Sequence, residues 1–399
     1  MENGFAGGRG KRNVLILSGS LGDGHRQAAE ALAEGFRKYR PEVNVQIVDS
    51  MEWMYPYVHT LVKYCFVKGV EKAPAVYGYL YQKTRRAEAV SLPLRSFLWL
   101  GLQKMAAKLG ALQTDEIVCT FPLAAAAVSL LKDKGLCGLP LITVITDHTD
   151  HSLWIHPHTD AYLVGSPQVK SALVRLGIEP SHVTVTGIPL RQRFCAVPDR
   201  EGLRAAFGLH SDARVALVMG GGCGLLGDLV REQLLLAAKR EAALRLVMVC
   251  GRNESYRKQL EEEVQLLRIG DRVRVLGFVT DIHQWMAVSD VLVTKPGGLT
   301  TAEALAMKLP MLLTKPIPGQ EEDNARFLEQ TGAAVRAAAD RGLDEQLLEL
   351  LRDPQRLAAM RRCADACGSR QSARRAIEQI GKVQRASVTA RTGRIPAFV

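Results

Sequence analysis

A repeated alternation of short buried strands with helical segments is the feature that most limits how this 399-residue chain can fold. The first half contains six aliphatic or β-branched runs, at residues 13–18, 44–50, 115–120, 141–146, 161–164 and 183–186. A second series occupies residues 215–219, 246–249, 273–276, 291–294, 311–314 and 334–336. Strands that alternate with helices form parallel sheets with helices on both faces. The sequence therefore predicts an α/β chain with two doubly wound, Rossmann-like domains.

Two strand–turn–helix units follow one another at residues 291–324. Glycines after the first strand precede a helix that we expect to open at Thr300, with Glu303 completing a capping box. A second helix is expected to begin near Glu321. Helix N-termini beside glycines suit phosphate groups, and carboxylates and amides suit sugar hydroxyls, although Glu322 and Asp323 are better explained as complements to a helix dipole. The candidate ligand-binding residues here are Gly297, Gly298, Thr300, Glu303, Gln320, Glu321 and Asn324.

The string at residues 297–328, GGLTTAEALAMKLPMLLTKPIPGQEEDNARFL, resembles the nucleotide-sugar signature of glycosyltransferase family 28. Within that family it is most similar to the monogalactosyldiacylglycerol synthases and the processive diacylglycerol glucosyltransferases of bacteria. The resemblance implies a GT-B architecture, in which two Rossmann-like domains face a cleft. It also implies that Gly220, Gly221 and Gly222 approach the diphosphate of a UDP-sugar, and that Phe278 and Val279 hold the uracil.

The strand series and the resemblance together predict the domain boundaries. We expect a disordered N-terminus at residues 1–12 and an acceptor-binding and membrane-binding Rossmann-like domain at residues 13–195. A UDP-sugar-binding Rossmann-like domain should span residues 196–370. Residues 371–399 should form the end of a helix that returns to the first domain and a basic tail.

A glycine-rich turn, GSLGDGH, follows the first strand at residues 19–25. Its spacing is not GxGxxG, so by itself it predicts no more than a tight turn. Because the lipid-glycosylating relatives begin with a similar stretch, the resemblance places Gly22, Asp23 and Gly24 near the acceptor. His25, at the start of a helix, then becomes a candidate base, since a helix N-terminus favours the neutral imidazole.

Residues 147–158, which follow the strand at 141–146, contain four histidines and two aspartates. They lack HExxH or another recognised ligand spacing, so a metal site is not predicted. The carboxyl ends of parallel strands line ligand crevices, so we expect Asp147 to be a residue of the cleft. The relatives carry a similar TD…W-x-H stretch, so the resemblance makes Asp147 the second candidate for the base or for a group that orients it. It also places Trp154 and His156 near the acceptor.

Residues 51–110 interrupt the strand–helix rhythm and hold ten of the 23 aromatic residues, with nine basic against three acidic residues. Aromatic residues interleaved with Lys and Arg are typical of interfacial helices, although an ordinary helical cap with buried aromatics would have a similar composition. In the resembled family this region is proposed to dock on lipid. We therefore predict a helical interfacial insertion that contacts anionic membrane lipids through Lys83, Arg85, Arg86 and Trp99.

The formal net charge of +11 could suit nucleic acid, but no nucleic-acid-binding motif accompanies it. No apolar run reaches the roughly 18–20 residues that span a bilayer, and the N-terminus lacks the apolar segment of a secretory signal. We expect a cytoplasmic protein that associates peripherally with the cell membrane.

The resemblance implies an inverting transfer of glucose or galactose from UDP-glucose or UDP-galactose to diacylglycerol or a related glycolipid, with no cofactor and no metal. An undecaprenyl-diphospho-muramoylpentapeptide N-acetylglucosaminyltransferase-like enzyme is the nearest alternative, although its N-terminal loop is usually richer in glycine. A UDP-sugar epimerase of the same fold would need no lipid, and a non-catalytic UDP-sugar sensor would need neither His25 nor Asp147. The choice of sugar, the exact acceptor and the number of transfers stay open.

Overall fold

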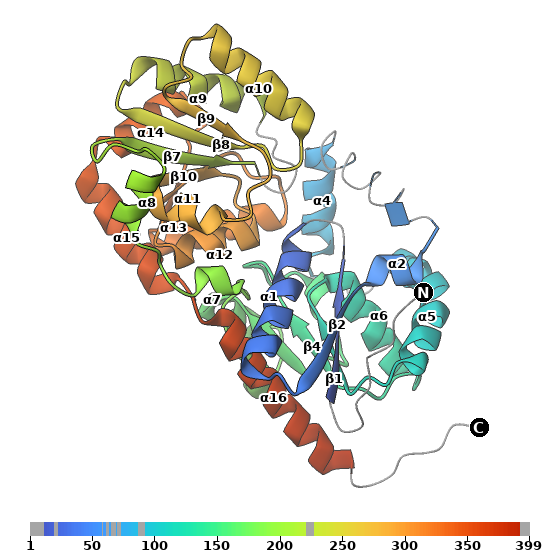
Figure 1. Cartoon of the computed structure of the whole chain (residues 1–399). Coiled ribbons are helices and arrows are strands. Elements are labelled where there is room, and N and C mark those ends of the chain that lie inside the picture. Colours follow the sequence, from blue (N-terminus) through green and yellow to red (C-terminus); the bar gives the residue numbers. More distant parts are fainter. Residues whose placement is uncertain are drawn as a thin grey trace. The chain divides into compact units, whose positions relative to one another are not determined.

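The computed structural model of the chain describes residues 12–19, 23–57, 59–60, 64, 69, 73–86, 92–220 and 227–391, without the side chains of residues 92–98, 100 and 384–391. It divides into two compact units, one formed by Met1–Gln192 with Gln371–Val399 and the other by Arg193–Arg370 (Figure 1). The N-terminal segment expected to be disordered lies outside the described residues as far as residue 11, and Arg12 already belongs to a strand. Residues 392–399 of the expected tail also lie outside them.

The first unit is an α/β unit built on one parallel sheet with the strand order β2-β1-β3-β4-β5-β6. Its elements are β1 (Arg12–Ser18), α1 (Asp23–Tyr39), β2 (Val43–Asp49), α2 (Ser50–Met54), α4 (Pro74–Thr84), α5 (Leu92–Ala111), β3 (Glu116–Cys119), α6 (Pro122–Asp133), β4 (Leu141–Val144), η1 (Ser152–Trp154), β5 (Ala161–Val164), α7 (Pro167–Arg175), η2 (Pro180–His182), β6 (Val183–Val185) and α16 (Ser372–Arg391).

The alternation of side chains along β1 divides the core of this unit into two layers. Leu15 and Leu17 pack in the cluster formed with α2, α5 and α6, whereas Val14 and Ile16 pack in the cluster formed with α1 and α16. All four of these side chains are fully buried. The C-terminal helix α16 therefore covers the same face of the sheet as α1.

The second unit contains the other parallel sheet, with the order β12-β11-β10-β7-β8-β9. Its elements are α8 (Arg200–Ala206), β7 (Arg214–Met219), α9 (Asp228–Arg240), β8 (Leu244–Val249), α10 (Glu254–Leu266), β9 (Val273–Leu276), α11 (Ile282–Val288), β10 (Val291–Thr294), α12 (Gly298–Ala306), β11 (Met311–Leu313), α13 (Gln320–Thr331), β12 (Ala334–Arg336), α14 (Leu343–Leu351) and α15 (Pro354–Cys367). In Figure 1, α9, α10 and α14 lie on one face of this sheet, and α11, α12 and α13 lie on the other.

Both predicted series of six strands are present, and all the strand pairs are parallel. The fold class predicted from the sequence, two doubly wound Rossmann-like domains of GT-B type, is confirmed. In each sheet the chain leaves one central strand toward one edge and later returns to its other side, which creates a topological switch point. These points lie between β1 and β3 in the first sheet and between β7 and β10 in the second.

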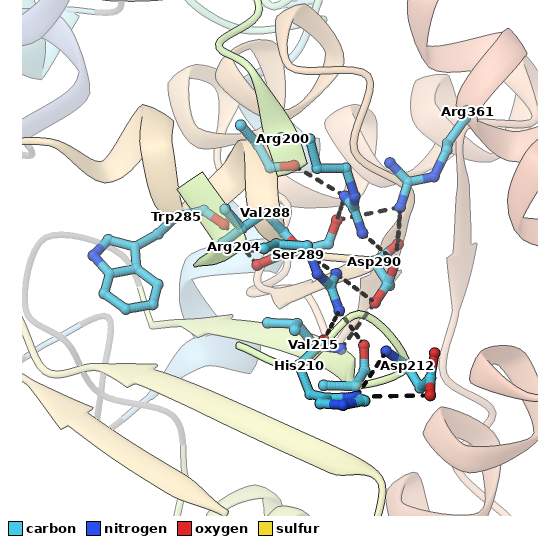
Figure 2. A network of polar contacts seen from close by, with 12 residues as sticks. Arg200, Arg204, His210, Asp212, Val215, Trp285, Val288, Ser289, Asp290 and Arg361 are labelled. Carbon is cyan, nitrogen blue, oxygen red and sulfur yellow. Dashed lines mark hydrogen bonds and ion pairs between the residues drawn. The ribbon is translucent and has the colours of Figure 1, made fainter. Parts of the chain in front are cut away.

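A polar network fixes the amino-terminal edge of the second sheet (Figure 2). The Asp290 carboxylate, just before β10, lies 2.5 Å from Arg200, 3.7 Å from Arg204 and 3.2 Å from Arg361, and it accepts a hydrogen bond of 2.9 Å from the backbone N–H of Val215. The arginines also donate to backbone carbonyls at the end of α11. One carboxylate thus joins α8 and α15 to the first residues of β7 and β10.

Candidate active site

The ends of β7 and β10 meet at the switch point of the second unit. The Thr294 hydroxyl, at the end of β10, donates a hydrogen bond of 2.9 Å to the carbonyl of Met219, at the end of β7. This bond joins the two strand ends that precede Gly220 and the turn at Gly297. Switch points at the carboxyl ends of parallel strands are where ligands bind in open α/β sheets. Gly221 and Gly222, predicted to approach the diphosphate, lie outside the described residues.

Helix α12 begins at Gly298, with Gly297 as its N-cap and no side chain capping it. The expected start at Thr300 and the capping box with Glu303 are therefore wrong, because Thr300 is the third helical residue and Glu303 the sixth. Glycine at the cap leaves the first N–H groups of the helix without a side-chain partner, and such groups bind phosphate. The Thr301 hydroxyl bonds back to the Gly297 carbonyl at 2.8 Å, which holds the turn tight.

Helix α13 also starts without a side-chain cap, at Gln320 after Gly319. Gly319 has φ of 130°, a backbone conformation that favours glycine. One carboxylate oxygen of Glu321 accepts a hydrogen bond of 2.8 Å from the Ile317 N–H, so Glu321 shapes the turn that precedes its own helix. The Asn324 side chain is completely buried, whereas Gln320 is half-buried at the helix start.

An exposed aromatic ring lies at the carboxyl edge of the same sheet. Phe278, which follows β9, is 57% exposed, and the Arg252 guanidinium lies 4.6 Å from its ring centre. Arg252 follows β8, the neighbouring strand. A planar cation and an aromatic face together suit a flat heterocycle such as uracil. Sequence reasoning missed Arg252, although its position in the turn that follows β8 could have indicated it. Val279, the residue after Phe278, is half-buried.

His25 occupies the switch point of the first unit. The Thr120 hydroxyl, after β3, donates to the His25 carbonyl at 3.0 Å, and the Phe121 ring lies edge-on to the imidazole at 5.2 Å. A Cβ on Gly19 would come within 2.5 Å of the Phe121 ring, so only glycine lets this ring reach its place. Asp23 is exposed and Gly24 half-buried at the start of α1, while Gly22 lies outside the described residues.

The residues that follow β4 complete the surroundings of the imidazole. The Thr146 hydroxyl lies 3.0 Å from His25 Nδ1, and the Trp154 ring lies 5.8 Å from the imidazole. Burial lowers the pKa of His25 below its usual value, while the charge of Asp147 and a hydrogen bond to the Thr120 backbone raise it. Burial is the largest effect, so His25 is neutral near pH 7 and able to accept a proton.

The histidines after β4 point to different partners. His148 lies 3.3 Å from Ser166, His156 lies 3.0 Å from the Leu153 carbonyl, and His158 lies 3.3 Å from Asp133. Burial lowers the pKa of His148 to about 3 and that of His156 to about 4. His156 and Trp154 are buried, so both support the loop from inside. Across the described residues, no group of three or more His, Cys, Asp or Glu side chains is placed to hold a metal ion.

The basic residues predicted to contact membrane lipid differ in their environments. Arg85 is largely buried and lies 2.6 Å from Asp150, whereas Arg86 is more exposed and lies 3.1 Å from the same carboxylate. Lys83 lies over the Tyr79 ring, and the Lys134 ammonium lies 4.6 Å from the centre of the exposed Trp99 ring.

The aromatic residues of this region fall into two groups. Trp53, Tyr55 and Tyr81 are buried, whereas Tyr57, Tyr64 and Tyr79 are exposed. In the part of the chain that the structure describes, no helix combines the length and apolarity needed to cross a bilayer.

Comparison with known proteins identifies relatives along nearly the whole chain. The family model for monogalactosyldiacylglycerol (MGDG) synthase matches residues 25–190, and the model for glycosyl transferases group 1 matches residues 231–366. The processive diacylglycerol beta-glucosyltransferase of Bacillus pumilus is 30% identical over 369 residues, which cover 92% of this chain and 94% of the relative.

Solved structures with much lower identity share the fold. The S. aureus MnaA–UDP complex superposes with a TM-score of 0.62 at 14% identity, covering 97% of this chain and 100% of that chain. MurG of Acinetobacter baumannii superposes with a TM-score of 0.59 at 15% identity, covering 93% and 99%. Both likenesses support the two-sheet architecture.

Proposed function

The chain belongs to the processive diacylglycerol beta-glucosyltransferase family, and we propose that it transfers glucose or galactose from a UDP-sugar to a hydroxyl of diacylglycerol or a related glycolipid. The observation that carries this proposal is the environment of His25. A neutral imidazole lies at the carboxyl edge of a parallel sheet, beside Thr146 and within the field of Asp147. In the second unit, the glycine-capped N-termini of α12 and α13 suit the diphosphate of the UDP-sugar.

The proposed chemistry is a direct displacement at the anomeric carbon. His25 accepts the proton of the acceptor hydroxyl while the acceptor oxygen bonds to the anomeric carbon. The bond from that carbon to the UDP oxygen breaks, and UDP leaves with the bonding electrons. Attack opposite the leaving group inverts the anomeric configuration. Asp147 stabilises the imidazolium that forms, because its charge favours the protonated ring.

The proposed stabilisation of the departing diphosphate needs no metal or other cofactor. Helix N-termini carry partial positive charge and unpaired N–H groups, and both α12 and α13 begin without a side-chain cap. Arg252 and Phe278 would enclose the uracil, and Glu303 and Gln320 would bond to hydroxyl groups of the ribose or hexose. Donors already in place stabilise developing charge without reorganisation during the reaction.

The direct test is incubation with radiolabelled UDP-glucose or UDP-galactose and diacylglycerol liposomes, followed by lipid extraction and chromatography. We expect label in the lipid phase from one of the two donors, in the presence of a chelator as well as in its absence. Release of free UDP or conversion of the sugar nucleotide without labelled lipid would contradict a lipid acceptor.

Glu303→Ala is expected to weaken UDP binding. A lost hydrogen bond to a charged group should cost about 1.5–3 kcal/mol of binding free energy, which titration calorimetry can measure. Glu349→Ala is the matched control, since Glu349 lies on α14 and pairs with Arg341 at 2.7 Å. Equal UDP affinity in the two variants would remove Glu303 from the donor site.

We propose that the exposed face of α4 contacts anionic membrane lipid. Val76, Tyr79 and Leu80 are each more than half exposed, and Lys83 lies beside them. An aromatic and aliphatic face flanked by Lys suits the interface of a bilayer, where each basic residue contributes on the order of 1 kcal/mol. This placement would make the protein a peripheral one at the cytoplasmic membrane surface.

The double substitution Tyr79→Ser with Leu80→Ser should reduce flotation with phosphatidylglycerol vesicles and lower activity on vesicle-borne acceptor. Activity on a short-chain micellar acceptor should be spared, because neither side chain bonds to the loop after β4. Leu266→Ser, which alters an 82% exposed side chain on α10, is the matched control. Unchanged flotation of the double variant would mean that this face is simply solvated.

A further inference from the structure

The C-terminal end of α4 is seated on residues 149–152, which follow the candidate base-orienting Asp147. The Tyr81 hydroxyl lies 2.9 Å from the Thr149 hydroxyl, and His151 Nε2 lies 2.9 Å from the Tyr81 carbonyl; both contacts are buried. The two rings also pack, with 4.1 Å between their centres. The last turn of α4 is thus built into the loop as part of its core.

Further bonds extend this junction beyond Tyr81. The Ser152 hydroxyl donates to the carbonyl of Thr84 at 2.8 Å, and its N–H donates to the carbonyl of Arg85 at 3.2 Å. These bonds satisfy carbonyls at the end of α4 that no later helical residue can reach. The loop therefore serves as the C-terminal cap of the helix.

Asp150 is the charged centre of the junction. Arg85 lies 2.6 Å from one of its carboxylate oxygens and Arg86 lies 3.1 Å from the other. The side chains of Asp150 and Arg85 are 12% and 19% exposed, so the ion pair is largely shielded from water. Burial raises the pKa of Asp150, but the two arginines outweigh that effect and hold it below its usual value. The carboxylate stays charged at neutral pH and keeps both arginines in place.

The same loop reaches the imidazole of His25 from two sides. Thr146, four residues before Asp150, lies 3.0 Å from His25 Nδ1. On the other side, His151 Nδ1 accepts a hydrogen bond of 3.1 Å from the Leu153 N–H and caps η1, which positions Trp154 at 5.8 Å from the imidazole. A displaced loop would move Thr146, Asp147 and Trp154 together.

We propose that Asp150, held by Arg85 and Arg86, is a positioning residue for the transfer reaction: it fixes residues 146–154 against α4 and thereby orients His25 and Asp147. The contact between α4, the helix with the exposed aromatic face, and the loop after β4 thus affects the orientation of His25. This inference rests on the function proposed above. Asp150 itself pairs with Arg85 and Arg86, which directly follow α4, and not with His25, so it acts through the loop.

A purely structural ion pair would give different kinetics. Its loss would lower the melting temperature and leave the folded enzyme with normal turnover and a normal pH profile. Loss of a positioning residue displaces the base, and a misplacement of about 1 Å can cost on the order of 10²-fold in rate. Removal of Asp147 from the imidazole would also lower the pKa of His25, because Asp147 is the charged group that raises it. Phe121, Thr146 and Trp154, which also lie beside the ring, carry no charge.

The test measures kcat, the KM for the UDP-sugar and the pH profile on a micellar short-chain diacylglycerol, so that membrane binding does not limit the rate. Asp150→Asn and Arg85→Gln should each lower kcat by roughly 10-fold to 10²-fold with an unchanged KM for the UDP-sugar. The acid limb of the kcat profile should move to lower pH. The double variant should be no worse than the poorer single variant, because both substitutions break one pair. Arg85→Lys should recover part of the activity.

Two further variants serve as a control for loss of an unrelated ion pair and as a milder change at Asp150. Glu378→Gln removes the exposed pair with Arg374 on α16 and should leave all three quantities unchanged. Arg86→Gln removes only the outer contact to Asp150, so it should give a folded enzyme with a smaller fall in kcat even where Asp150→Asn does not fold. Normal kcat and a normal pH profile in Asp150→Asn, or in Arg86→Gln if only that variant folds, would overturn the positioning role alone. Absence of a glycosylated lipid product from the parent enzyme would overturn the proposed function and this inference together.

Discussion

His25→Ala is expected to lose about 10²–10⁴-fold of turnover, the usual contribution of a general base. UDP binding should persist, since the glycine-capped helices α12 and α13 and the pair formed by Arg252 and Phe278 belong to the second unit. Turnover is measured with labelled donor, and UDP affinity by calorimetry on the same preparation. Loss of UDP binding in this variant would mean that the loop at residues 19–25 belongs to the donor site.

The pH profile separates the two candidate bases. Because burial holds the pKa of His25 below its usual value, the parent enzyme should stay active as the pH falls below 6.5 and lose activity only when the imidazole becomes protonated. Asp147→Asn removes a charge that raises this pKa, so its acid limb should lie at still lower pH, with reduced turnover. Near-normal turnover in His25→Ala beside an inactive Asp147→Asn would transfer the base role to Asp147.

The strands could be predicted from the sequence because each is a short apolar run with its pattern set locally. The runs at residues 161–164, 273–276, 291–294 and 334–336 match the observed strands residue for residue. In a parallel sheet covered on both faces, a strand must be apolar on both sides, which leaves a strong signal in the sequence. Helix starts were less predictable. Thr300 with Glu303 three residues later suggested a capping box, but the tight turn after β10 places Gly297 at the N-cap instead.

The contacts that define the candidate base could not be predicted, because they join residues far apart in the chain. Thr120 and Phe121 reach His25 across about a hundred residues, and the order of strands, not the local sequence, makes β1 and β3 neighbours. The same limit applies to Arg85. Arg85 was assigned to a membrane surface from the composition of residues 51–110. That composition contains no information about partners in another segment, so the pairing with Asp150 was missed.

The pairing of Arg85 also changes how membrane contact must be tested. Reversal of its charge would break the junction with the loop after β4 as well as alter the surface, and the two effects would be inseparable. Tyr79 and Leu80, whose side chains face solvent on the same helix, isolate the surface effect. Asp150 isolates the effect on the loop.

Asp290→Asn is expected to destabilise the second unit by on the order of 3 kcal/mol, because removal of one partner leaves buried charge uncompensated. Three arginines surround this carboxylate, and their remaining described partners in the network are neutral carbonyls (Figure 2). Burial lowers the pKa of Arg200 and Arg361, as expected for charges held largely out of water. The amide that replaces the carboxylate keeps its shape and one acceptor for the Val215 N–H, so the loss is chiefly electrostatic.

Native-state hydrogen exchange followed by mass spectrometry should detect this loss peptide by peptide, so that residues 193–370 are measured separately from the rest of the chain. The whole second unit should exchange faster, since Asp290 joins β7 and β10 at its centre to α8 and α15. Glu349→Gln, which removes an exposed pair with Arg341 in the same unit, is the control and should change little. Faster exchange confined to α8 would mean that the network clamps one helix only, whereas unchanged protection would show that the carbonyls alone satisfy the three arginines.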